Sequence, residues 1–195
     1  MKSSLSQREI LFFRLLLALA LIVLAAALRV APHPWNFTPI GAMALFSGAI
    51  IHDRRLAFLF PLLALFAGDL FAGLYNFKVM LVVYASFLLS VMIGRLLKRR
   101  RTIARLSGAT FLGALQSFLI TNFAMWWLYD TYANSAAGLV ACYVAGLPLF
   151  RNTLAGDGVY VTFLFGGYAL AEHFFPGLRE PAPIISITER TGENP

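Results

Sequence analysis

Residues 31–42 read Ala-Pro-His-Pro-Trp-Asn-Phe-Thr-Pro-Ile-Gly-Ala, and they separate two strongly apolar segments of the chain. Three prolines within eight residues exclude a regular helix here, because each proline lacks a backbone N–H and restricts the residue before it. His33, Trp35 and Asn36 need hydrogen-bond partners or an interface. Irregular polar backbone in a membrane bundle must pack in protein or line a wet cavity. The stretch therefore predicts one wall of a ligand pocket, and the alternative is a rigid turn with Trp35 as an interface anchor.

The composition is that of an integral membrane protein. Of 195 residues, 59% are hydrophobic and only 13% are charged, and the mean hydropathy is +0.75, whereas soluble domains are about half apolar and about a quarter charged. A single cysteine excludes an intramolecular disulfide framework or a multi-cysteine metal site, and we expect neither a metal nor a cofactor. The net charge of +7 does not indicate nucleic acid, because the basic residues lie between apolar runs.

Six apolar runs predict an all-α bundle of six transmembrane helices within one domain, residues 1–175. The first run, Ile10–Leu28, is interrupted only by Arg14, which we expect to reach the inner interface; a cleaved signal peptide is the alternative. Gly138–Leu149 is too short to cross and is interpreted as a re-entrant or interfacial piece. Residues 176–195 carry four prolines and predict a disordered cytoplasmic tail. The six predicted spans are residues 10–28, 38–51, 56–74, 77–97, 106–128 and 152–175.

The basic residues predict the orientation of this bundle. With both termini in the cytoplasm, the inner segments hold thirteen basic residues and the outer ones hold three, so the positive-inside rule favours this topology. The run Arg95–Arg105 is also expected to bind anionic lipids. The inner residues are Lys2, Arg8, Arg14, Arg54, Arg55, Arg95, Lys98, Arg99, Arg100, Arg101, Arg105, Arg179 and Arg190, and the outer ones are Arg29, Lys78 and Arg151.

Polar side chains gather in the outer halves of three predicted helices. By the helical rise, Asp69 lies roughly 21 Å above Arg55, and Asn122 lies roughly 24 Å above Leu106. A carboxylate inside a membrane helix is costly and therefore indicates a function, although each of these groups could also bond within a packed core. The predicted ligand-binding residues are His33, Trp35, Asn36, Thr38, Asp69, Asn122, Asn152 and Asp157.

Several motifs together resemble a known group of membrane proteins. They are the stretch Pro32–Phe46, the Thr-Asn-Phe at 121–123, the Cys-Tyr at 142–143 and the Asn-Thr-Leu-Ala-Gly-Asp at 152–157. The chain resembles an uncharacterised bacterial six-helix family related to the substrate-binding (S) components of energy-coupling-factor vitamin transporters. The resemblance implies capture of a vitamin-like small molecule at the outer face, with a separate coupling membrane subunit and ATPases supplying energy. The Ala-xxx-Ala docking pattern of such components is absent from the first helix, which leaves solitary function open.

Two other function classes remain as alternatives. A membrane enzyme acting on a lipid-linked substrate could use Asp69 and Asp157 as acid and base or as metal ligands. No GxxxxGK[ST], HExxH or GxSxG motif accompanies them. A structural membrane subunit with a well-packed core is the third class.

Overall fold

The computed structural model describes residues 7–28 and 34–178, and these residues are helical apart from short connections. The described chain is all-α, with six α-helices and one short 3₁₀ helix. The helices are α1 (Gln7–Leu28), α2 (Ile40–Ile50), α3 (Arg54–Ala72), α4 (Phe77–Leu96), α5 (Ile103–Leu128), α6 (Ala136–Phe174) and η1 (Pro176–Leu178).

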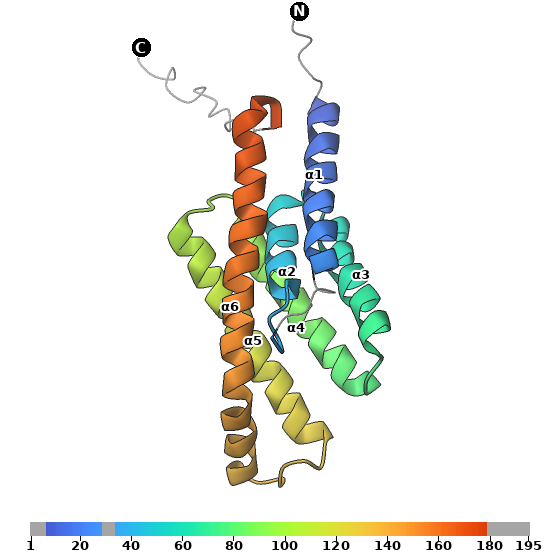
Figure 1. Ribbon diagram of the computed structural model, residues 1–195, viewed down its shortest axis with the longest axis vertical. Helices are drawn as coiled ribbons and strands as arrows, with labels where there is room; N and C mark the ends of the chain where they lie inside the picture. The colour runs from blue at the N-terminus through green and yellow to red at the C-terminus, as the bar shows by residue number, and fades with distance from the viewer. Residues whose placement is uncertain (1–6, 29–33, 179–195) are drawn as a thin grey trace, which may run out of the picture.

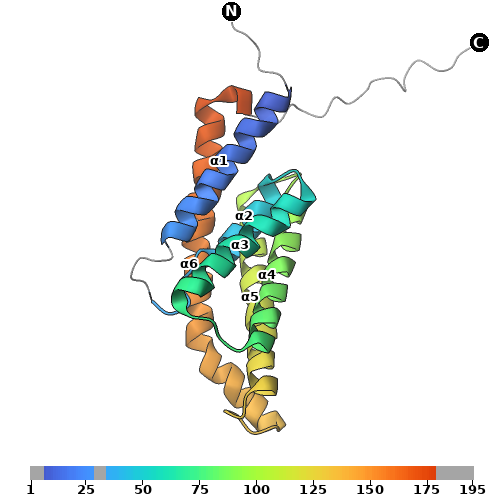
Figure 2. The ribbon, with the colours of Figure 1, turned by 90° about the vertical axis from the view of Figure 1, so that its right-hand side faces the viewer.

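The short helix α2 lies in the middle of the molecule, with α1, α3, α4 and α6 around it (Figures 1 and 2). It contacts all five other α-helices. Its sequence contains no charged residue, and every residue from Ala42 to Ile50 is buried. An apolar helix that is buried on all sides is the expected centre of a bundle.

Two glycines let α2 and α4 approach each other closely. A Cβ atom at Gly48 would overlap the backbone carbonyl oxygen of Val91, and one at Gly94 would overlap that of Leu45. Small residues at such contacts strengthen helix association in a membrane, because close backbones gain van der Waals contact. The second half of α2 is therefore fixed against α4.

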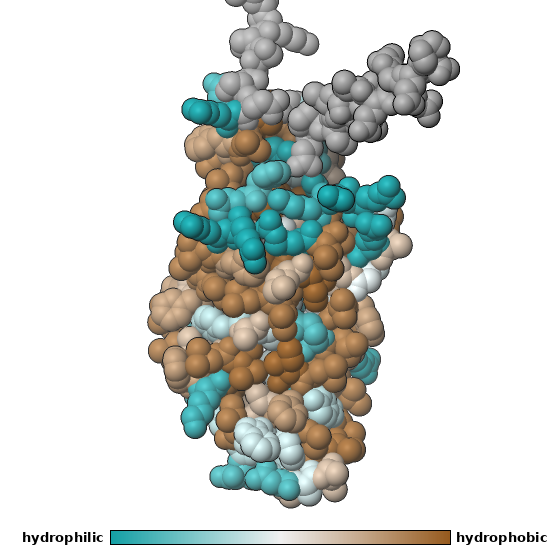
Figure 3. All heavy atoms as spheres, turned by 180° about the vertical axis from the view of Figure 1, so that it is seen from behind, coloured by the Kyte–Doolittle hydropathy of each residue, from teal (hydrophilic) through white to brown (hydrophobic). Residues whose placement is uncertain are grey.

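Four of the described helices, α1, α4, α5 and α6, are long and apolar enough to cross a membrane. The surface between their polar ends is largely apolar, and a belt of hydrophilic atoms lies toward one end (Figure 3). The chain is a multi-pass membrane protein. Figure 1 places the α2–α3 and α4–α5 connections toward the end of the bundle where α1 begins and α6 ends, and the α3–α4 and α5–α6 connections toward the other.

The last helix differs from the sequence prediction. Residues 138–149 are not a separate re-entrant piece, and the final helix does not begin at residue 152: α6 runs unbroken from Ala136 to Phe174. Pro148 lies inside it, with an exposed side chain, so its ring displaces no packed neighbour. Arg151 is an exposed residue of this helix and not a loop residue. At 1.5 Å per residue, 39 residues extend about 58 Å, well beyond a hydrocarbon core of about 30 Å.

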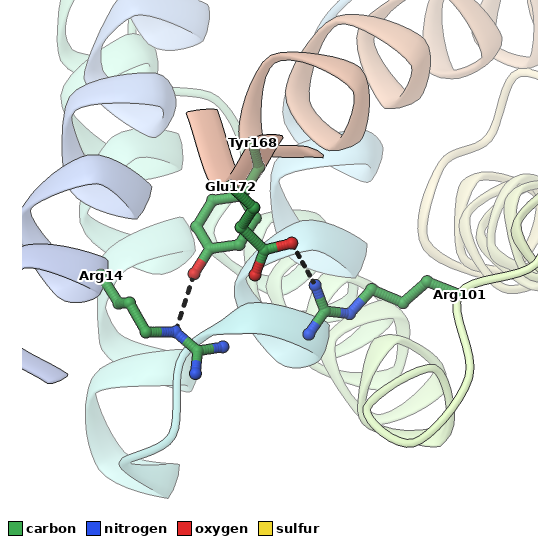
Figure 4. A network of polar contacts seen from close by, with 4 residues as sticks. All are labelled: Arg14, Arg101, Tyr168 and Glu172. Carbon is green, nitrogen blue, oxygen red and sulfur yellow. Dashed lines mark hydrogen bonds and ion pairs between the residues drawn. The ribbon is translucent and has the colours of Figure 1, made fainter. Parts of the chain in front are cut away.

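An arginine of the first helix is buried against the last helix. Arg14 is 6% exposed, and its Nε donates to the hydroxyl of Tyr168 on α6 at 3.0 Å. Arg101, in the α4–α5 connection, lies over the Tyr168 ring and 3.9 Å from the carboxylate of Glu172 (Figure 4). This network joins α1, α6 and the α4–α5 connection toward the end of the bundle where α1 begins and α6 ends.

Polar side chains cap the starts of α3, α4, α5 and α6, the last through Ser135. Asp53 accepts from the backbone N–H of Leu56 at the start of α3, and Thr102 caps α5 in the same way through Arg105. The N–H of Leu56 lowers the pKa of the Asp53 carboxyl, because it stabilises the charged form. Asn76 caps α4 by accepting from the N–H of Lys78.

Candidate functional site

A cavity of about 400 Å³ lies between the start of α2, the end of α3, and parts of α4, α5 and α6. Four of the predicted ligand-binding residues line it together: Asn36, Thr38, Asp69 and Asn122. They come from the proline-rich stretch, α3 and α5, which are far apart in the sequence. The remaining polar residues of its lining are Tyr75, Ser117, Thr121 and Thr153.

Asp69 supplies the carboxylate of the cavity. It is only 4% exposed, and its Oδ2 accepts a hydrogen bond from the hydroxyl of Tyr84 on α4 at 3.0 Å. Among the described residues that line the cavity, none is Lys, Arg or His. A buried carboxylate at the wall of a cavity is a group that a ligand can reach and is expensive to keep unless it is used.

The end of the proline-rich stretch forms one wall of the cavity. The N–H of Phe37 donates to the carbonyl of Pro34 at 3.0 Å, which closes a turn. Asn36 has a φ of 61°, in the left-handed region that asparagine tolerates better than most residues. The turn directs Asn36 and Thr38 to the cavity. His33, which was also predicted to bind ligand, lies outside the described residues.

Trp35 and Asn152 support this wall and do not line the cavity. The side chain of Trp35 is 85% exposed, so it faces away from the core. Its backbone carbonyl accepts from Nδ2 of Asn152 on α6 at 3.0 Å. Asn152 therefore ties the turn to α6, and we interpret its role as positioning the wall.

Asp157 does not line this cavity either. It is 2% exposed on α6, and its Oδ1 accepts from the backbone N–H of Ala42 in the first turn of α2 at 3.0 Å. Pro39, at the N-cap of α2, has no side-chain donor or acceptor. Asp157 thus caps α2 from another helix, and Gly41 makes room for it, since a Cβ there would lie 2.5 Å from both carboxyl oxygens. The pairing of Asp157 with Asp69 was predicted from depth alone, and the structure does not bring the two into one site.

The α5 wall follows from the spacing of its polar residues. Ser117 and Thr121 are four residues apart and so lie on one face of the helix. Asn122 lies beside Gly146 of α6, where a Cβ would come 2.5 Å from its Oδ1. Ser117, Thr121 and Thr153 were not predicted as site residues; the spacing of the first two in a polar-rich helix is the signal that could have identified them.

Three phenylalanines give the cavity an apolar, aromatic part: Phe87 of α4, Phe118 of α5 and Phe150 of α6. The ring centroids of Phe118 and Phe150 are 4.9 Å apart with an interplanar angle of 41°. Concave sites that bind small molecules combine such apolar walls with a few convergent polar groups. Among the described residues of the lining, no nucleophile–base pair is seen.

Metal-binding chemistry has no support in residues 7–28 and 34–178, which hold no group of three or more His, Cys, Asp or Glu placed to share an ion. Cys142 is buried, and its thiol donates to the backbone carbonyl of Asn122 at 3.4 Å. It behaves as a small buried side chain between α5 and α6.

Other hollows lie away from the predicted residues. One of about 260 Å³ lies between the first half of α1 and the α2–α3 connection, and one of about 750 Å³ lies between α1 and the end of α6. The larger has an apolar lining that includes Phe13, Leu17 and Phe174. Because its walls are apolar helix faces, lipid chains suit it.

Comparison with known proteins adds a family assignment. No curated protein matches this chain, and no solved structure matches it. A family model described as "Family of unknown function (DUF6580)" matches residues 10–178. The matched region contains every described residue that lines the cavity. The chain therefore belongs to DUF6580, a family of unknown function.

Proposed function

We propose that this protein captures a small molecule from the outer side of a bacterial inner membrane, as the substrate-binding component of an uptake system. The observation that carries the proposal is the cavity of about 400 Å³ that joins Asn36, Thr38, Asp69 and Asn122. A largely preformed hollow with one buried carboxylate, several hydroxyls and three aromatic rings has the composition of a small-molecule site.

The orientation is part of the proposal. The basic residues of the α4–α5 connection belong to the end of the bundle where α1 begins and α6 ends (Figure 1), and the positive-inside rule favours that end as the cytoplasmic one. The cavity is lined by Tyr75 in the α3–α4 connection and by Met125 in the last turn of α5, which belong to the opposite end. A ligand would therefore arrive from outside. Arg95–Arg105 would contact anionic lipids of the inner leaflet.

Cysteine labelling tests this orientation. In a Cys142→Ser background, Arg99→Cys and Asp130→Cys each place a thiol at an exposed residue of opposite connections. A maleimide that cannot cross the membrane should label Asp130→Cys in intact cells and Arg99→Cys only after the cells are opened. The reverse pattern would contradict the proposed direction of capture.

The energy for uptake would come from other subunits. The sequence has no P-loop, so ATP hydrolysis would need separate ATPases and a coupling membrane subunit, as in the energy-coupling-factor transporters whose S components the sequence resembles. In that setting the captured molecule would be vitamin-like. The geometry gives less support to the two other function classes. An enzyme would need a second carboxylate in the site, but Asp157 caps α2 instead. A purely structural subunit would not require a cavity.

Native mass spectrometry of the gently purified protein tests the capture function. We expect a small molecule to co-purify with the wild type and to be lost from Thr153→Phe, which fills the cavity from the α6 wall. Thr162→Phe is the matched control, because Thr162 lies on the same helix, is exposed, and like Thr153 donates its hydroxyl to the carbonyl four residues earlier.

The two variants separate loss of the site from loss of the fold. If both retain the molecule equally, the cavity is not where it binds. If neither wild type nor control carries any small molecule, even after incubation with a water-soluble cell extract, the capture function is wrong.

A further inference from the structure

We propose that two copies of this chain associate in the membrane through a groove between the first half of α5 and the second half of α6. The groove has a volume of about 720 Å³. None of the described residues lines both this groove and the cavity of the candidate site. The association therefore goes beyond capture of a small molecule, and its test does not depend on that function.

The groove lies between two helices that are long and apolar enough to cross a membrane. Its apolar lining comes from α5 through Ile103 and Leu106 and from α6 through Val161 and Phe165. The side chain of Ile103 is 84% exposed, so most of its surface has no cover within the described chain. Lipid chains or another helix can cover such a surface, and the small residues of the lining distinguish the two.

Two glycines of α6 open onto this groove. A Cβ atom added at Gly158 or at Gly166 would meet no atom within 4 Å. A glycine inside a helix costs about 1 kcal/mol relative to alanine, and no close contact within the described chain offsets that cost at these two positions. The other glycines of α6 do have atoms of other segments within that distance, and they are Gly138, Gly146, Gly156 and Gly167.

The spacing of the small residues favours a helix over a lipid chain. Gly158, Thr162 and Gly166 recur every four residues, and all three are exposed on one face of α6. Small residues at this spacing let two helices approach closely in lipid, where van der Waals contact drives association. A lipid chain gains nothing from such a strip, because it adapts equally well to bulky side chains. Thr162 Oγ1 donates to the carbonyl of Gly158 at 2.8 Å, and its oxygen can still accept a bond from across the contact.

The charges at one end of the groove favour a second copy of this chain as the source of that helix. Arg101 and Glu172 both line this end, and 3.9 Å separates Arg101 Nη1 from Glu172 Oε2 (Figure 4). In a dimer with a two-fold axis along the membrane normal, the same surface of each copy meets itself. Arg101 of one copy then faces Glu172 of the other at the same depth. The surface is self-complementary in charge as well as in the size of its residues.

Cysteine cross-linking of the full chain in native membranes tests this contact. In a Cys142→Ser background, Thr162→Cys and Ala169→Cys each place a thiol on the groove. Phe163→Cys and Leu170→Cys are the matched controls, since each is the next residue, at nearly the same depth but about 100° around the helix. All four residues are exposed, and neither control residue lines the groove. After oxidation with copper phenanthroline, we expect the groove variants to form about fivefold more covalent dimer than their controls.

Filling the groove gives the second arm of the test. Gly158→Leu has open space at its Cβ, so it should unfold at the same temperature as the parent. When it is combined with Ala169→Cys, we expect the yield of covalent dimer to fall about fivefold, because the added side chain separates the two helices.

The other outcomes would overturn the proposal. Equal yields at groove and control positions would indicate random collision of the copies. A yield that Gly158→Leu leaves unchanged would place the contact elsewhere. If none of the four cysteine variants gives a covalent dimer, the groove is covered by lipid or by a different protein, and association of two copies is wrong.

Discussion

Two regions around α2 each hold a buried aspartate, and the surroundings of the two carboxylates differ. In the closed region, made by Asp157, Gly41 and the α2–α4 contact at Gly48 and Gly94, the carboxylate caps a helix and backbone atoms nearly touch. In the cavity region, Asp69 borders an open space of about 400 Å³. Depth in the membrane is thus a poor guide to function. The surroundings of each carboxylate are the better guide to its role. A carboxylate that accepts from a backbone N–H supports the fold, whereas one at a cavity wall is placed where a ligand could contact it.

The largest effects should come from the α2–α4 contact. Gly48→Ala and Gly94→Ala each place a methyl group onto a backbone carbonyl that cannot move without separating the helices, so we expect a loss of about 3 kcal/mol or more, at the upper end of overpacking. Gly158→Ala and Gly166→Ala are the controls, because nothing lies within 4 Å of either added atom. Size-exclusion profiles and thermal unfolding in detergent measure the outcome. A Gly94→Ala variant as stable as the wild type would show that the α2–α4 contact is not closely packed, and the difference between the closed region and the cavity region would be lost.

The next effect concerns the cap. Asp157→Ala removes the only side-chain acceptor seen at the first turn of α2 in the described structure, and should cost about 1–3 kcal/mol of stability, as expected when a buried donor loses its partner. Asp157→Asn keeps an acceptor oxygen and should lose less. Thermal unfolding of both variants measures the difference. Equal stability of Asp157→Ala and the wild type would mean that Asp157 does not stabilise the fold, and Asp157 would again be a candidate ligand-binding residue.

On the cavity side, Asn36→Ala should weaken binding without loosening the fold. Asn36 lines the cavity from a surface turn, so the expected cost to ligand affinity is about 1–3 kcal/mol. Titration of the co-purified molecule, once identified, gives the affinity, and thermal unfolding of the empty protein serves as the control. A variant that unfolds earlier but binds normally would make the turn a structural element only.

The smallest effect should belong to Trp35. Its side chain is 85% exposed and contributes nothing to the lining of the cavity. Trp35→Ala should therefore change affinity by about twofold or less, within the range of surface substitutions, because the backbone carbonyl that Asn152 holds is retained. The same titration measures it. A loss as large as that of Asn36→Ala would mean that the indole closes over the bound molecule.

Much of the helix pattern could be predicted because apolar runs and charged loops are local features. The ends of α1 to α5 lie within three residues of the predicted runs. The start of α6 could not be placed, because a proline such as Pro148 usually interrupts a helix and an arginine such as Arg151 usually flanks an apolar span. Only the exposed positions of these two residues explain why the helix continues through them. Likewise, helical depth could bring Asp69 and Asn122 together, and the proline-rich stretch that enters at that depth supplied Asn36 and Thr38. The sequence could not show that Asp157 bonds a backbone N–H 115 residues away.

The most direct test of the central claim compares Asp69→Asn with Asp157→Asn in the same two assays. Thermal unfolding without ligand reports the fold, and native mass spectrometry of the co-purified molecule reports the cavity. We expect Asp69→Asn to unfold within a few degrees of the wild type but to carry little or no bound molecule. Asp157→Asn should unfold earlier, and its folded fraction should bind normally. If Asp69→Asn instead loses stability while its folded fraction binds as the wild type does, the cavity is not a ligand site and the account is contradicted.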